Sequence, residues 1–354
     1  MKYFTIGPVQ MSPRVAAAGG VQAAYFRDEE FADRVVVAQD EILRLFDAPV
    51  GSALAVISSS GTGGMEAALL NFTRRGDPVL VVNGGSFGKR FADLARFHGR
   101  EVTDIRPGLG RDLDLDTLAT AVNETRFAAV LMNAHETSTG QKYDIAAVAD
   151  LCRRTKTLLI CDAVSTLACD PFTMRDLGVN VLVFSSNKGL ALAPGLGFVA
   201  VDPEALARQS CTESFYFDLA PYLAGAKRGQ PPFTSSVAVL MQLFERLDEI
   251  RQQGGIAHVT AAVAVRAQAF RDALAKQGIA LFPQTPSNAI TAFVLEKGTS
   301  DGLYDYLKSN HGLLINKSAW GLGVDVPRVS HVGDLTIDDH IELAHAIEGY
   351  LTCI

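Results

Sequence analysis

Two side chains that can do chemistry follow short apolar runs near the middle of the sequence. Asp162 ends the run Leu158-Leu-Ile-Cys-Asp162, and Lys188 follows the run that begins at Val181. Runs of this length are typical of buried strands, and in an open α/β sheet ligands bind at the carboxyl ends of the strands. A lysine amine and a carboxylate at that edge suit pyridoxal 5'-phosphate (PLP), which needs an amine for a Schiff base and an anion beside its pyridine nitrogen. Taken alone, the pair is equally typical of a surface lysine and an N-capping aspartate.

A turn of small residues, Ser58-Ser-Ser-Gly-Thr-Gly-Gly64, lies between an expected strand and an expected helix. Small residues let backbone N–H groups approach an anion, and a helix N-terminus adds a favourable dipole. The third glycine of a dinucleotide fingerprint and the lysine of a Walker A loop are both missing from this turn. A phosphate cradle therefore remains, with a plain N-capped turn as the alternative.

Three later side chains could complete a site. Phe87 follows another strand end, where it could stack on a flat ring or belong to the core of the next helix. Thr137 could donate a hydrogen bond to a cofactor, whereas His135 has no second ligand at metal-binding spacing, so we predict no metal site. Arg328 lies in a short strand-like run and could bind a carboxylate bidentately, or be a surface arginine on an edge strand.

The elements that must position these residues alternate along the first two thirds of the chain. Near-continuous apolar strands separated by helices predict an α/β fold with a mostly parallel sheet covered on both faces. We expect strands at 53–57, 79–82, 128–132, 158–161, 181–184 and 197–201, and helices at 31–46, 63–72, 87–97 and 145–154.

The remainder of the sequence predicts two domains and an arm. Residues 1–30 are rich in Gly and Pro and form an expected N-terminal arm, followed by a large PLP-binding domain at 31–254 and a small C-terminal domain at 255–354. We expect long helices at 237–253 and 256–277, strands at 290–295 and 328–332, and helices near 301–309 and 338–351.

Composition excludes several classes of function. The chain has 354 residues and a formal net charge of −7, which gives no electrostatic footprint for nucleic acid or an anionic membrane. We expect neither a signal peptide nor a membrane span, because no long apolar run occurs. The five cysteines form no CxxC pair, which favours a reduced, cytoplasmic setting.

Taken in order, these motifs resemble those of the class V aminotransferases, PLP-dependent enzymes of fold type I. The resemblance runs nearly end to end and is strongest to the branch with alanine–glyoxylate, serine–pyruvate and 2-aminoethylphosphonate–pyruvate aminotransferases. Its motifs are Gly7-Pro8, Ser60-Gly-Thr-Gly63, His135-Glu-Thr-Ser-Thr-Gly140, Cys161-Asp-Ala-Val-Ser165, Ser185-Ser-Asn-Lys188 and Arg328. It implies a large domain with a mostly parallel seven-stranded sheet flanked by helices, and a small C-terminal α+β domain.

The resemblance also implies roles for single residues. Lys188 would form the Schiff base and move protons, and Asp162 would pair with the pyridine nitrogen. Arg328 would bind the α-carboxylate of the substrate, with Gly7 and Arg27 beside it. The other implied contacts to PLP come from Ser60, Gly61, Thr62, Gly63, Phe87, Thr137, Ser165 and Asn187, and from Thr234, which would reach the neighbouring subunit of a homodimer with shared active sites.

Two departures from the family pattern affect the expected substrate. Asn187 stands where relatives carry Gln, one methylene longer, and Pro231 stands where alanine–glyoxylate enzymes carry a Tyr. The second departure favours the aminoethylphosphonate-like side of the branch. A phosphonate would need further cations, and the candidates are Lys227, Arg228, Arg14, Arg27, Lys89 and Arg90.

The leading hypothesis is therefore a ping-pong transamination. An amino acid or a 2-aminoethylphosphonate-like amine would give its nitrogen to PLP, and pyruvate or glyoxylate would take it. The alternative is a PLP-dependent lyase or a cysteine desulfurase-like enzyme, but such desulfurases carry His where this chain has Phe87 and Asn187. A scaffold without catalysis is disfavoured because Lys188, Asp162 and Arg328 are all retained.

Overall fold

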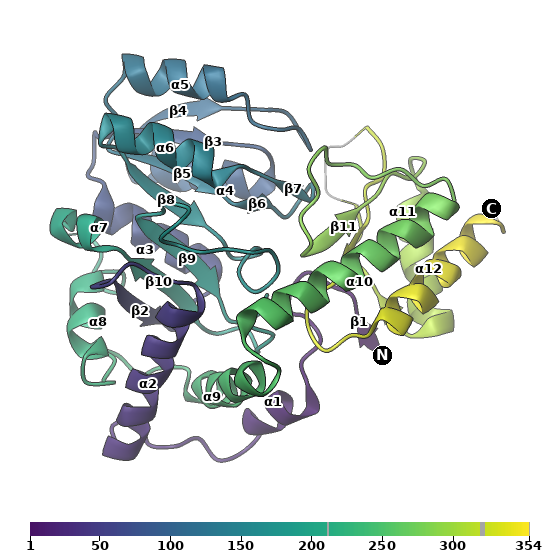
Figure 1. The fold of residues 1–354 in the computed structure, drawn as a ribbon, viewed down its shortest axis with the longest axis horizontal. Coiled ribbons are helices and arrows are strands. Elements are labelled where there is room, and N and C mark those ends of the chain that lie inside the picture. The colour runs from purple at the N-terminus through teal and green to yellow at the C-terminus, as the bar shows by residue number, and fades with distance from the viewer. Residues whose placement is uncertain (211, 319–322, 354) are drawn as a thin grey trace.

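A seven-stranded sheet organises the larger part of the molecule (Figure 1). The computed structural model describes residues 1–210, 212–318 and 323–353. The strand order is β2-β10-β9-β8-β5-β3-β4; β10 is antiparallel to both of its neighbours, and all other neighbouring pairs are parallel. The strands are β2 (Ala53–Ile57), β3 (Pro78–Val82), β4 (Glu101–Ile105), β5 (Ala129–Asn133), β8 (Leu158–Asp162), β9 (Val181–Ser185) and β10 (Gly197–Val201). The predicted α/β fold with a mostly parallel sheet of seven strands is confirmed.

Helices cover both faces of this sheet, as strands that are apolar along their whole length require. The helices are α2 (Glu29–Leu45), α3 (Gly61–Phe72), α4 (Ser86–Phe97), α5 (Leu115–Glu124), α6 (Ile145–Thr155), α7 (Pro203–Arg208), α8 (Leu219–Ala226) and α9 (Val237–Gln252). Strand β4 and helix α5 are not among the elements predicted from the sequence. Strand β4 lies at the edge of the sheet and is only partly buried, so its sequence carries the polar residues Glu101, Thr103 and Asp104 and lacks the apolar run from which the other strands were predicted.

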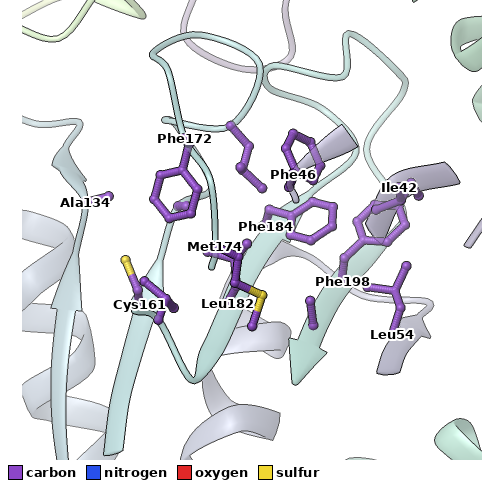
Figure 2. Packing of buried hydrophobic residues seen from close by; sticks show 14 of the residues in the cluster. Ile42, Phe46, Leu54, Ala134, Cys161, Phe172, Met174, Leu182, Phe184 and Phe198 are labelled. Carbon is purple, nitrogen blue, oxygen red and sulfur yellow. The ribbon is translucent and has the colours of Figure 1, made fainter. Parts of the chain in front are cut away.

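Strand β9 shows how the two faces are filled. Phe184 stacks on Phe198 of β10 at 4.7 Å between ring centroids and meets Phe46, just after α2, edge to face (Figure 2). Val183, one residue earlier, points to the opposite face and packs in a second core with Met65 and other residues of α3. Packing on both faces fixes β9, and with it the position at which Lys188 leaves the sheet.

The small domain lies beside the sheet, and α10 (Ile256–Lys276, green in Figure 1) runs from α9 into it. It contains the antiparallel pair β11 (Ile290–Ala292) and β13 (Arg328–Ser330), and α12 (Ile337–Leu351) packs against α10. The predicted helix near 301–309 is divided into α11 (Thr299–Tyr306) and a π-helical turn (Leu307–His311), which is followed by β12 (Leu313–Leu314).

The N-terminal arm is fastened to this small domain. Strand β1 (Lys2–Tyr3) pairs in parallel with β12, and Phe4 is fully buried in the small-domain core beside Phe270 and Phe293. The arm then forms a short helix, α1 (Pro13–Ala18), against α9. The first and last parts of the chain are therefore one packing unit.

Some properties of the described residues bear on function. No helix in residues 1–210, 212–318 and 323–353 is long and apolar enough to cross a membrane. Within the same ranges no group of three or more His, Cys, Asp or Glu side chains could hold a metal ion. Cys152, Cys161 and Cys169 are buried and Cys353 is exposed, all as free thiols, and Cys211 lies outside the described residues.

Candidate active site

Asp162 is the last residue of β8 and is buried, with 5% of its surface exposed. One oxygen accepts a hydrogen bond from Asn133 Nδ2 (2.6 Å), at the end of the neighbouring strand β5, and the other accepts one from the Val164 backbone N–H (2.8 Å). Burial raises the pKa of Asp162 to about 6, while these hydrogen bonds and the charge of Lys188 act in the opposite direction. The fold holds this carboxylate in a fixed orientation, and its burial means that a cation beside it would stabilise its charged form.

Lys188 follows β9 on a loop that folds back on itself. Ser186 N–H donates to the Leu196 carbonyl (2.9 Å), and a Cβ at Gly189 would collide with the Leu167 carbonyl, so the loop requires glycine there. Lys188 is half-buried as a residue, and burial lowers the pKa of its amine to about 8, while Asp162 raises it. A lysine with a lowered pKa has a larger neutral fraction at physiological pH, which nucleophilic chemistry needs.

Gly7 of the N-terminal arm lies directly against Lys188. A Cβ at Gly7 would be 2.8 Å from the Lys188 Nζ, so any other residue would displace the amine. The backbone N–H of the preceding Ile6 donates to Asn316 Oδ1 (2.8 Å), which ties the arm to the small domain at this point. Asn316 was not predicted as a site residue, and nothing near it in sequence signals this contact.

Arg328 enters the site from β13 of the small domain. Its Nη1 donates to the Thr137 carbonyl (3.3 Å) and its Nη2 to the Lys317 carbonyl (3.1 Å). Its Nε is buried and has no hydrogen-bond partner among the residues that the structure describes. Burial lowers the pKa of Arg328, and the charge of Glu136 raises it. A guanidinium with an unsatisfied buried donor is suited to bind a carboxylate.

A chain of hydrogen bonds runs behind the site. Thr137 Oγ1 lies 2.7 Å from Ser165 Oγ, which in turn lies 2.9 Å from His135 Nδ1. All three residues are buried, and burial lowers the pKa of His135 to about 4, so its ring is neutral at pH 7. The arrangement fixes the Thr137 and Ser165 hydroxyls, and His135 lies behind them as a buried hydrogen-bond partner.

The small residues predicted as a phosphate cradle form the N-terminus of α3. Ser60 caps the helix and accepts from the Gly63 N–H (3.4 Å). Thr62 Oγ1 accepts a hydrogen bond from Arg90 Nη1 (2.8 Å), and the Arg90 guanidinium lies 4.6 Å from the centre of the Phe87 ring. Arg90 therefore links the cradle to the aromatic ring, a role that sequence reasoning missed because it treated Arg90 only as a substrate-binding cation.

Packing is a second reason for the glycines of this turn. A Cβ at Gly61 would lie 2.7 Å from a methyl group of Val164, and one at Gly64 would lie 2.9 Å from a methyl group of Val183. The N-terminus of α3 therefore packs closely against the segment that follows Asp162 and against strand β9.

Glu136 is a buried anion that sequence reasoning did not assign to the site. Its carboxylate accepts from the backbone N–H groups of Phe87 (3.1 Å) and Gly88 (2.9 Å) at the start of α4, and from the Ser138 hydroxyl (2.6 Å). A negative charge at a helix N-terminus is favourable, so Glu136 fixes the position of α4 and of the Phe87 side chain. An acidic residue following a strand end was the available signal.

Two predicted residues, Arg27 and Thr234, are exposed in this one chain, and a third, Asn187, directly precedes Lys188 on the same loop. Arg27 is exposed and donates from Nη1 to Gln230 Oε1 (3.2 Å), and Thr234 is exposed on the loop before α9. Asn187 is half-buried and accepts from the Ser185 hydroxyl (3.1 Å). Among the other candidate cations, Arg14 pairs with Glu245 and Asp248, Lys89 pairs with Asp93, and Lys227 and Arg228 are exposed.

Comparison with known proteins agrees with this geometry. The family model for aminotransferase class V matches residues 14–323. A soluble hydrogenase 42 kDa subunit of Anabaena cylindrica is 28% identical over 308 residues, which is 85% of this chain and 80% of that protein. An L-aspartate–glyoxylate aminotransferase of Paracoccus denitrificans is 31% identical over 294 residues, covering 78% of this chain and 73% of the relative. The crystal structure of a subgroup IV aspartate aminotransferase from Thermus thermophilus superposes with a TM-score of 0.93 at 26% identity, covering 100% of both chains.

The fold and the site define a PLP-dependent transaminase of fold type I. The chain belongs to the class V aminotransferase family. The residues present fit the cofactor: an amine whose pKa is lowered by burial, a buried carboxylate, and a helix N-terminus with a threonine hydroxyl lie at one edge of the sheet. The predictions of family, fold, enzyme class and cofactor are confirmed.

Proposed function

We propose that this enzyme moves an amino group from an amino acid, or from a 2-aminoethylphosphonate-like amine, to pyruvate or glyoxylate in a ping-pong reaction. The observation that carries the proposal is the position of Arg328. Its guanidinium is held by the Thr137 carbonyl, one residue after Glu136, and its charge is close enough to lower the pKa of Lys188. A substrate carboxylate bound there would have its α-carbon near the amine that must move the proton.

PLP, when bound, supplies an aldehyde that takes up the amino group and a ring that accepts electrons. The chain supplies the rest. Lys188 Nζ would hold the cofactor at rest and then move the Cα proton as general acid and base. Asp162, oriented by Asn133, would hold the proton on the ring nitrogen, and the burial that raises its pKa would strengthen its pairing with a cation there.

The remaining residues would position the cofactor. Phe87 would stack on its ring, and Thr137 would donate to its phenolic oxygen with the Ser165 hydroxyl behind it. The phosphate would lie at the N-terminus of α3, where backbone N–H groups and the helix dipole favour an anion. Its contacts there would come from Ser60, Gly61, Thr62, Gly63 and Asn187.

A homodimer with shared sites would give Arg27 and Thr234 a function. Both lie near Gln230 on an exposed surface, where Phe215 is 85% exposed and its ring contacts that of Phe233. Large exposed aromatic residues next to one another are typical of interfaces. In such a dimer Thr234 would reach the phosphate of the other subunit and Arg27 its substrate. The division into an arm at 1–30, a large domain at 31–254 and a small domain at 255–354 is part of the same proposal.

A half-reaction screen tests the function. Purified PLP enzyme is mixed, without an oxo acid, with aspartate, alanine, serine, glutamate or 2-aminoethylphosphonate, and the cofactor absorbance is followed to its amine form. We expect a rapid change with one donor, and reversal on adding glyoxylate or pyruvate. Aspartate is the first donor to try, because the named activities of two similar proteins involve it. Loss of the amino group as ammonia without formation of the amine form would replace transamination by lyase chemistry.

A further inference from the structure

A cavity of about 650 Å³ lies where the N-terminal arm, α9, α10 and the small domain meet. Its charged lining comes from Arg14, Arg246, Glu249, Arg266 and Asp334, together with the exposed His258. None of the residues proposed to hold PLP or substrate lines it. Ala191 does line it, and the Ala191 N–H donates to the Lys188 carbonyl (2.8 Å), so the cavity lies behind the loop that carries the reactive lysine.

Arg246 is the least satisfied cation in this lining. It is 9% exposed, and its Nη1 donates to Glu249 Oε2 (3.1 Å). Its Nε is buried without a hydrogen-bond partner in the described part of the chain. The other Glu249 oxygen accepts from the Ser12 hydroxyl (2.6 Å), so Glu249 is shared between the arm and Arg246. A mostly buried guanidinium that shares its one carboxylate partner with the arm is poorly compensated, and a second anion beside it would be favourable.

A second guanidinium lies nearby. Arg266 on α10 donates from Nε to the His331 carbonyl (2.9 Å) and from Nη1 to the Leu335 carbonyl (3.0 Å). Burial lowers the pKa of Arg266, and the charge of Arg246 lowers it further, while Cys169 and Asp334 raise it. The two arginines therefore repel each other, and the carboxylates of Glu249 and Asp334 offset this repulsion.

We propose that this cavity binds a small organic or inorganic anion through a carboxylate or phosphate group, which lies close to the guanidinium groups of Arg246 and Arg266. The guanidinium fork is the side-chain geometry suited to either group. This binding site is separate from the one that takes the substrate. Its occupation would fasten the arm to the small domain, because the Asp334 N–H already donates to the Gln10 carbonyl (2.9 Å) at the rim of the cavity.

The test is calorimetric titration of the PLP enzyme with inorganic phosphate and, separately, with succinate, at constant ionic strength. Three single variants are compared with the unchanged protein. Arg246→Met keeps most of the aliphatic part of the side chain and removes the guanidinium group. Arg251→Met removes an equal charge from the same helix at an exposed position, where Arg251 pairs with Glu41 and Asp248. Arg328→Met removes the anion-binding group of the active site.

We expect saturable binding of at least one probe, weakened by about tenfold or more in Arg246→Met and retained in both other variants. The probe that binds distinguishes a phosphate site from a carboxylate site. Binding that disappears in Arg328→Met and persists in Arg246→Met would place the anion in the active site and overturn the proposal, as would the absence of saturable heat with both probes. The half-reaction screen is independent of these titrations, so the failure of one proposal does not imply failure of the other.

Discussion

The active site has two sides that are built differently. On the sheet side, Asp162 and Thr137 are buried and bonded to side chains from neighbouring strand ends, namely Asn133 and Ser165. On the other side, Gly7 and Arg328 come from the arm and the small domain, and among the described residues the Arg328 side chain donates to two backbone carbonyls and leaves its Nε without a partner.

This difference suggests a division of labour. Side chains that are satisfied by one another keep their geometry without a ligand, as a cofactor-binding surface requires. In the part of the chain that the structure describes, Arg328 donates to backbone carbonyls, which suits a group that binds and releases substrate. Because Phe4 and β1 pack in the small domain, Gly7 and Arg328 would move together if that domain moved.

The largest effect should come from Lys188→Ala on the sheet side. We expect turnover to fall by about 10³-fold or more, because the general acid–base group and the covalent anchor are both removed. Thermal stability should not fall with it, since burial already disfavours the charged amine and lowers its pKa to about 8. Steady-state rates measure the loss of turnover, and a melting curve measures thermal stability. Retained turnover would show that Lys188 is not the acid–base group of the mechanism.

Most of the sheet side was predictable, and the physical reason is locality. Asp162 ends an apolar strand and Lys188 closely follows another, and the carboxyl ends of parallel strands meet at one edge, so residue type and position were enough. Strand β4 was missed because Glu101 and Asp104 interrupt its apolar pattern at the edge of the sheet. The boundaries of the other strands of the sheet agree within a residue because apolar runs end where burial ends.

Contacts between distant segments could not be predicted. Nothing in the sequence indicates that Arg90 reaches Thr62 or that Asn316 holds the arm, because such pairs depend on how elements pack. Resemblance to the family indicated that Arg328 belongs to the site, but not that its Nη1 is held by the Thr137 carbonyl. The places of Arg27 and Thr234 depend on a second subunit and stay predictions.

An intermediate effect should come from Arg328→Met on the substrate side. We expect KM for carboxylate substrates to rise by about 10- to 100-fold, because a charge-assisted pair is lost, while the affinity for PLP stays unchanged. Arg153→Met, at an exposed position on α6 where Arg153 pairs with Asp150, is the matched control. An unchanged KM, or loss of PLP together with substrate affinity, would show that the two sides are not separate.

The smallest and most specific effect is the pH dependence of PLP capture by the enzyme stripped of cofactor. Attachment needs the neutral Lys188 amine, whose pKa is lowered by burial from 10.5 to about 8. The capture rate should therefore rise about tenfold per pH unit below that value and level off above it. The linked stability has the same sign: the unfolded chain keeps the lysine proton up to its ordinary pKa, so between these two pKa values it binds more protons and the stability of the folded state rises with pH.

Stopped-flow absorbance at constant ionic strength measures this rate, with a simple alkylamine as the reference for titration of PLP itself. In Asp162→Asn the carboxylate that raises the pKa of Lys188 is gone, so the midpoint should shift to lower pH. A midpoint near that of the free alkylamine would mean that the surroundings of Lys188 do not lower its pKa. Lys188 would then give no support to the contrast between a preorganised cofactor side and a ligand-dependent substrate side, and the support would come from the buried, hydrogen-bonded Asp162.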